Sequence, residues 1–208
     1  MKLSYLPALF LSAALTCSAV SLPDSLKTEK QGSILWNGIR ISHSGIYGKW
    51  QSARKETPEI RQNDGTITIT QTHLYPNASG KGTISLIPLT ENSFQLESKD
   101  EIPAGIKPNL RYLSLAVPVV NAEKFITSQD GSKEFHFPEK YGTMILGHFH
   151  RITRAELVLK DGSRLVLHPG GKTIYLQDDR PFSKRPGQNE TFSIRIWHSG
   201  DNFSCRLE

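Results

Sequence analysis

The sequence predicts an all-β protein, an antiparallel β-sandwich or jelly-roll-like single domain. Short runs with alternating apolar and polar residues recur at fairly even intervals along the 208 residues. Turn signals rich in Gly, Asn, Asp and Pro separate these runs. No window places apolar residues at helical spacing over three turns. Many short strands with regular turns are typical of two packed sheets.

The stretch from Ala155 to Leu176 shows this pattern most clearly. Residues 156–160 and 164–168 alternate with period two, and Asp161-Gly162 lies between them. Asp-Gly favours a tight hairpin because both central positions of the turn adopt positive φ. A second reversal is expected at residues 169–171, Pro-Gly-Gly, before a third strand. The pattern predicts an antiparallel meander of three strands.

The N-terminus predicts export. A basic start, Met1-Lys2, precedes a mostly apolar segment from Leu3 to Leu15, which is too short to span a bilayer. Cys17 and Ala19 are small residues at the two positions that a signal peptidase recognises, which favours cleavage after Ala19. Residues 1–19 are therefore expected to be the signal peptide of a secreted or periplasmic protein. Acylation of Cys17 is the alternative, although the preceding residues form a poor lipobox. We expect no transmembrane segment in the mature chain.

The remaining chain divides into a polar linker, residues 20–33, and a β-sandwich domain, residues 34–208. An Asn-Gly turn at residues 37–38 is expected to join two strands, and residues 66–72, TITITQT, alternate cleanly. We expect loops at the Ser/Gly-rich residues 42–48 and at residues 100–109, which hold two prolines. The last clear strand is residues 191–197, with alternate residues forming an apolar face.

Composition excludes several classes of protein. The net charge is +5, but basic residues are scattered among acids, and nucleic-acid binders concentrate positive charge on one face. We therefore expect no nucleic-acid partner. Without the leader, Cys205 is the only cysteine, so a disulfide scaffold is excluded and a buried thiol is expected.

Two histidines suggest one alternative, a metal site. His148 and His150 lie on one face of a predicted strand, and Glu156 follows with a spacing close to that of the first cupin motif. The second motif is missing, because Ile174 stands where its histidine would fall. We predict no cofactor, and we keep His148, His150 and Glu156 as the alternative metal ligands.

Other catalytic signatures are weak. No strand presents two acids at alternating positions, as a jelly-roll glycosidase requires, and no nucleophile or phosphate-binding motif occurs. Tyr47, Trp50 and Tyr75 could instead supply flat rings for stacking on a sugar, and the first two lie in a Gly/Ser-rich loop where binding residues often occur. Trp197 ends a strand and is expected in the core.

From Gly82 onward the chain resembles a β-sandwich accessory module at the N-terminus of some secreted bacterial glycoside hydrolases. Five segments carry the resemblance. They are residues 112–118, residues 137–141 (Phe-Pro-Glu-Lys-Tyr), the three-strand stretch 155–176, residues 177–180 (Gln-Asp-Asp-Arg) and residues 192–196. No catalytic barrel follows Glu208. The resemblance implies a non-catalytic module in which Asp178, Asp179 and Arg180 make structural ion pairs at a strand end.

These observations favour an exported, non-catalytic β-sandwich that binds carbohydrate or serves as a cell-surface accessory, with polysaccharide or a cell-surface glycan as partner. Two alternatives stay open. One is an enzyme, with a cupin-like metal site or jelly-roll activity on glycans. The other is a structural or protein-interaction domain. Exposed rings would indicate a sugar binder, and convergent polar groups in a hollow would indicate an enzyme.

Overall fold

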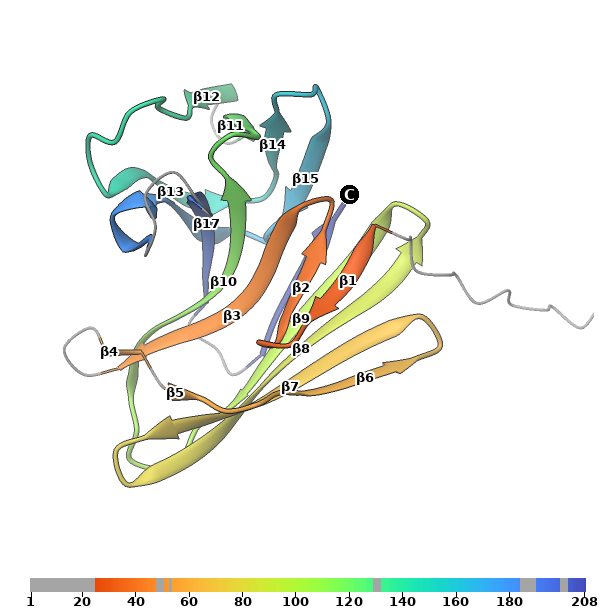
Figure 1. Cartoon of the computed structure of the whole chain (residues 1–208), viewed down its shortest axis with the longest axis vertical. Coiled ribbons are helices and arrows are strands. Elements are labelled where there is room, and N and C mark those ends of the chain that lie inside the picture. The colour runs from red at the N-terminus through yellow and green to blue at the C-terminus, as the bar shows by residue number, and fades with distance from the viewer. Residues whose placement is uncertain (1–24, 48–50, 53, 129–131, 184–189, 199–201) are drawn as a thin grey trace, which may run out of the picture.

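Two antiparallel sheets pack face to face in a computed structural model of the chain, which confirms an all-β sandwich (Figure 1). The structure describes residues 25–47, 51–52, 54–128, 132–183, 190–198 and 202–208. The expected signal peptide, including Cys17, therefore lies outside the described residues. None of the described segments forms a helix of the length and apolar character needed to cross a membrane.

We call the two layers sheet A and sheet B. In order across sheet A, the strands are β1 (Leu26–Glu29), β2 (Ser33–Trp36), β3 (Ile39–Tyr47), β10 (Pro108–Pro118), β17 (Thr191–His198), β16 (Lys172–Asp178) and β13 (Ile145–Ile152), with β4 (Gln51–Ser52) paired to β3. The short 3-10 turn η1 (Arg180–Phe182) follows β16.

Sheet B forms the second layer. Its order is β12 (Ser132–His136), β11 (Ala122–Ser128), β14 (Ala155–Leu159), β15 (Arg164–His168), β18 (Asn202–Leu207), β9 (Ser93–Glu101), β8 (Ala78–Thr90), β7 (Thr66–Tyr75) and β5 (Arg54–Lys55), with β6 (Glu59–Asn63) also paired to β7. The chain crosses between layers several times, so neighbouring strands are often distant in sequence.

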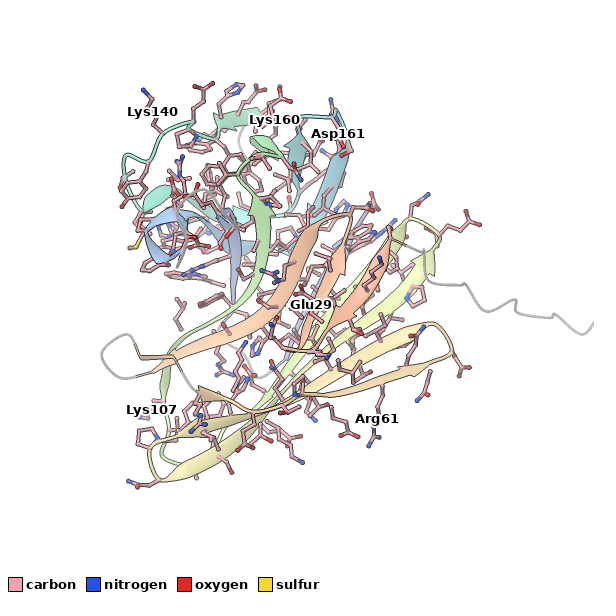
Figure 2. All side chains as sticks on the ribbon, in the orientation of Figure 1. Glu29, Arg61, Lys107, Lys140, Lys160 and Asp161 are labelled. Carbon is pink, nitrogen blue, oxygen red and sulfur yellow. The ribbon has the colours of Figure 1, made fainter. Side chains whose placement is uncertain are left out.

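The core lies between the sheets and follows the predicted alternation. Ile67 and Ile69 of β7 point inward with exposures of 2% and 1%, and the apolar side chains on the inner face of β17 are equally buried. Phe94 of β9 meets Trp36 edge to face, with ring centroids 5.0 Å apart. Cys205 is buried in β18, as expected. Charged side chains such as Arg61 and Lys140 project from the periphery (Figure 2).

The turns between strands confirm the Gly-based predictions. Asn37 and Gly38 have φ of 49° and 78°, and Gly162 has φ of 84°. The third strand of the central stretch, however, does not continue a meander. β14 and β15 belong to sheet B, whereas β16 pairs with β13 and β17 in sheet A. Positive φ at Gly170 and Gly171 turns the chain from one layer to the other at this point.

Three predicted loops are partly strand. Residues 26–29 of the expected linker form β1, where Leu26 is buried against the core. β3 continues through residues 39–47 instead of ending before a Ser/Gly loop. β9 runs on to Glu101, so the crossing between sheets is shorter than expected.

One edge of sheet A has an irregular backbone. β13 is the last strand of sheet A among the described residues, and its pairing with β16 shifts register between Phe149 and Ile152. Within this interval Arg151 adopts a φ of 54°, which side-chain-bearing residues rarely do.

Candidate functional site

The outer face of sheet A gathers aromatic side chains from four neighbouring strands. Strand register puts His148 of β13 opposite Tyr175 of β16, and Tyr112 of β10 opposite Trp197 of β17. We call Tyr112, His148, His150, Tyr175 and Trp197 the aromatic face. Their neighbours on the same strands, such as Ile174 and Ile196, point into the core, because successive side chains of a strand alternate between faces.

The rings of the aromatic face touch one another. Tyr175 and Trp197 stack with centroids 3.9 Å apart and planes at 13°. His148 lies 3.9 Å from Tyr175 and 4.0 Å from His150, again between centroids. His148 is exposed, and Tyr175 and Trp197 are half-buried. Partial burial, and then the neighbouring His150, lower the pKa of His148, so this ring is neutral over most of the physiological range.

A charged pair borders these rings on the same face. The guanidinium of Arg195 lies over the ring of Tyr112, 4.9 Å from its centroid. Arg195 Nη2 also lies 3.4 Å from Asp179 Oδ1. Asp179 accepts further hydrogen bonds from Gln177 Nε2, at 2.6 Å, and from the Ser193 hydroxyl. The aromatic face is therefore continuous with fixed hydrogen-bonding groups, and Trp197 lies in this surface instead of in the predicted core.

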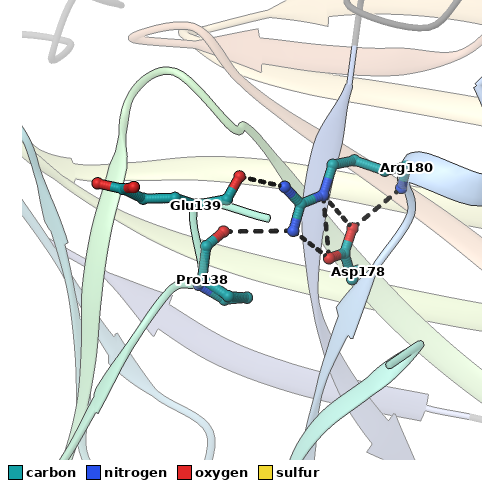
Figure 3. A network of polar contacts seen from close by, with 4 residues as sticks. All are labelled: Pro138, Glu139, Asp178 and Arg180. Atoms are coloured by element: carbon teal, nitrogen blue, oxygen red, sulfur yellow. Dashed lines mark hydrogen bonds and ion pairs between the residues drawn. The ribbon is translucent and has the colours of Figure 1, made fainter. Parts of the chain in front are cut away.

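Asp178, one residue earlier, points the other way and is fully buried. Figure 3 shows its carboxylate paired with Arg180, whose Nε lies 2.9 and 3.0 Å from the two oxygens and whose Nη2 lies 2.5 Å from Oδ2. Arg180 also donates to the main-chain oxygens of Pro138 and Glu139, at 3.2 and 2.7 Å. The ion pairs that were expected of Asp178, Asp179 and Arg180 are confirmed.

The aromatic residues chosen from the sequence are not in this patch. Trp50 lies outside the described residues, and only the backbone of Tyr47 is described, at the end of β3. Tyr75 ends β7 in sheet B and packs beside Gly80, where a Cβ would meet its ring at 3.3 Å. The structure therefore joins neither Tyr47 nor Tyr75 to the aromatic face.

The alternative metal ligands are divided between the two sheets. His148 and His150 adjoin on the outer face of sheet A, with His150 Nδ1 3.3 Å from Thr173 Oγ1. Glu156 lies on β14 in sheet B, where its oxygens lie 2.5 Å from Arg154 and 3.0 Å from Arg164. Because Glu156 pairs with these two arginines on the other sheet, it does not join His148 and His150 as the third ligand of a cupin-like metal site.

A different polar cluster lies inside the sandwich, between the sheets. His43 of β3, His73 of β7 and Asp100 of β9 are exposed by only 2%, 4% and 6%. Their potential ligand atoms all lie within 4.8 Å of one another, and they form the sole such group of three among the residues the structure describes. The rings of His73, His43 and His198 follow one another at 5.9 and 5.8 Å. We call His43, His73 and Asp100 the interior cluster.

Two cations adjoin the interior cluster. Arg111 Nη1 lies 3.9 Å from Asp100 Oδ2, and His43 Nε2 lies 3.2 Å from the same oxygen. Lys55 has an exposed stem, but its Nζ donates to the main-chain oxygen of His43. Burial alone would raise the pKa of Asp100, but the hydrogen bond from His43 and the surrounding positive charges hold it below its ordinary value.

The basic groups of the interior cluster are correspondingly harder to protonate. Burial, with the charges of His43 and Lys55, lowers the pKa of His73 to about 4, so this imidazole is neutral at physiological pH. Desolvation also lowers the pKa of Lys55, and the charge of Asp100 partly opposes that shift. The cluster therefore presents neutral imidazole beside one carboxylate.

The sequence contained a signal that His73 and Asp100 point inward, although not that they meet. The alternation of Ile67, Ile69 and Gln71 extends by one step to His73, and the alternation of Leu96 and Ser98 extends likewise to Asp100. Each strand was ended too early, which left these side chains in loops. No protein-family model matches the chain, and no curated protein matches it either.

Proposed function

We propose that the protein is an exported, non-catalytic β-sandwich that binds carbohydrate through the aromatic face of sheet A. One observation carries the proposal: the half-buried stacked pair Tyr175 and Trp197 lies on the outer face of sheet A beside the exposed imidazole of His148. Export follows from the N-terminal pattern of residues 1–19 alone.

The mixture of groups on this face suits a sugar. Tyr175 and Trp197 offer apolar ring area that suits the apolar face of a pyranose. The indole N–H of Trp197 is buried, so hydrogen bonds to the sugar would come from other groups. Asp179 and Arg195 offer an acceptor and donors at fixed positions, because Gln177 and Ser193 hold the carboxylate. An open face with these groups suits a segment of a polymer better than an enclosed small molecule.

The surface hollows support binding in preference to glycan hydrolysis. A glycosidase places two carboxylates about 5 to 10 Å apart on either side of the bond. Three hollows in the described part of the chain each include one carboxylate, from Glu97, Glu190 and Glu101 respectively. None of the three provides the pair.

The test is a glycan array probed with the mature protein, followed by titration calorimetry on the best ligand. We expect Tyr175→Ala to weaken binding about tenfold, which corresponds to about 1.4 kcal/mol. The matched control is Tyr141→Ala, because Tyr141 is 49% exposed and lies away from the aromatic face. Thermal unfolding of both variants would show that the fold is retained.

Three outcomes would contradict the proposal. The first is an array without any retained glycan. The second is an equal loss of affinity in Tyr175→Ala and Tyr141→Ala, which would indicate a nonspecific effect. The third is a loss of affinity in Trp50→Ala together with full binding by Tyr175→Ala, which would favour the residues chosen from the sequence over the aromatic face.

A further inference from the structure

We propose that His43, His73 and Asp100 form a site for a divalent transition-metal ion that prefers imidazole ligands, such as Zn²⁺ or Cu²⁺. This site is separate from the aromatic face and does not depend on the proposed carbohydrate binding. Two imidazoles and one carboxylate are a donor set that such ions accept.

The first step is the direction in which the imidazole nitrogens point. His43 Nδ1 and His73 Nε2 are both buried, and neither has a hydrogen-bond partner. A Cβ on Gly82 would lie 3.2 Å from each of these two atoms. The two nitrogens therefore lie at equal distance from one common point. A Cβ at this point would also lie 2.7 Å from His73 Cε1, so the two rings leave no room for a side chain on residue 82. Buried nitrogens without partners are costly, and a shared ligand would satisfy both.

The second step is the role of Asp100. Its Oδ2 lies 3.2 Å from His43 Nε2, although these two atoms do not form a well-aligned hydrogen bond in this structure. A small rotation of the ring would direct Nε2–H to the carboxylate and leave Nδ1 for the ion. A carboxylate behind a histidine is the usual support of a metal-bound imidazole. Asp100 also supplies the negative charge that a divalent cation requires in a buried place.

The third step concerns fit and access. Tetrahedral Zn²⁺ holds nitrogen ligands about 3.3 Å apart, given Zn–N bonds of about 2.05 Å. The ligand atoms of the interior cluster lie within 4.8 Å of one another, so binding requires the side chains to close by up to about 1.5 Å. Lys55 lies at the solvent side of the cluster, since the residue is exposed and its Nζ donates to the main-chain oxygen of His43.

Lys55 and Arg111 oppose the binding of a cation, and this gives the proposal its most specific consequence. Arg111 remains near Asp100, at 3.9 Å, but Lys55 is attached only at its tip and can swing into solvent. Removing the ammonium group should therefore improve metal affinity. We expect Lys55→Met to bind Zn²⁺ about tenfold more tightly. Lys99→Met is the matched control, because Lys99 is 63% exposed on the outer face of sheet B and should leave the affinity unchanged.

The experiment starts with purified mature protein that has been treated with a chelator and titrated with Zn²⁺ by calorimetry, with elemental analysis of the product. We expect one ion per chain. His73→Gln and Gly82→Ala should each weaken binding more than tenfold, the second because its Cβ would fill the common point. His148→Ala/His150→Ala should bind as the wild-type protein does.

The results also separate this site from its alternatives. Absence of bound metal in the wild-type protein overturns the proposal. Loss of the metal in His148→Ala/His150→Ala, with retention in His73→Gln, assigns it to the outer pair and also overturns the proposal. If His73→Gln does not fold, Lys55→Met decides the question, because an unchanged affinity in that variant contradicts a site at the interior cluster.

Discussion

Loss of Arg180 should destabilise the protein more than loss of any other arginine whose contacts are described above. Arg180→Met removes three close contacts to Asp178 and leaves that carboxylate, which has 0% exposure, without its counter-ion (Figure 3). Removing one partner of a buried ion pair costs about 3 to 5 kcal/mol. The main-chain oxygens of Pro138 and Glu139 also lose their hydrogen-bond donor. Each lost hydrogen bond lowers the free energy of unfolding by about 0.5 to 1.5 kcal/mol unless water replaces the donor. We expect a total of about 4 to 8 kcal/mol.

Urea unfolding followed by tryptophan fluorescence measures this cost. The control is Arg61→Met, because Arg61 and its partner Glu59 are 68% and 58% exposed and such a pair contributes less than about 1 kcal/mol. Asp178→Asn/Arg180→Met should cost less than the sum of the single variants, since the double variant leaves no buried charge. A cost below about 1 kcal/mol for Arg180→Met, or strict additivity, would refute the reasoning.

Three further predictions concern the core and its titrating groups. Phe94→Ala should lower stability by about 3 to 5 kcal/mol, because it opens a cavity against Trp36, and a melting curve measures it. Burial raises the pKa of Cys205 to about 12, so iodoacetamide should alkylate it only after unfolding, and early labelling would contradict this. The pKa of His73 is about 4 in the folded protein and about 6.5 in the unfolded chain, so between these values only the unfolded chain binds the proton. With chelator present, the free energy of unfolding should therefore fall by about 3 kcal/mol from pH 6.5 to pH 4, and His73→Gln should remove that dependence.

The fold class could be predicted from the sequence because a two-residue period and Gly-based turns are local signals. Ile67 and Ile69 were placed inward correctly, and the turn at Asp161-Gly162 formed as expected. The assignment of strands to sheets is not local. β15 and β16 are separated by one Pro-Gly-Gly turn, yet they lie in different layers, since pairing with β18 and β17 decides their position.

The candidate sites were harder to predict than the fold. The alternation along the strand predicts that Trp197 and His198 point to opposite faces of the sheet, but it does not predict which of the two faces packs against the other sheet. His198 lies inside, and Trp197 joins the aromatic face. The interior cluster combines residues from three strands that meet only in the folded sandwich, so no spacing along the chain could reveal it. Gly82 looks in the sequence like an ordinary strand residue, whereas in the structure a Cβ at this position would lie 2.7 Å from the ring of His73 and 3.2 Å from that of His43.

The left-handed backbone at Arg151 has a consequence for self-association. A regular edge strand offers a row of free N–H and C=O groups to another chain and thereby promotes aggregation. β13 cannot offer such a row along its whole length, because its register is interrupted between Phe149 and Ile152. We therefore expect that a change that straightened residue 151 would give neighbouring molecules a longer edge on which to pair.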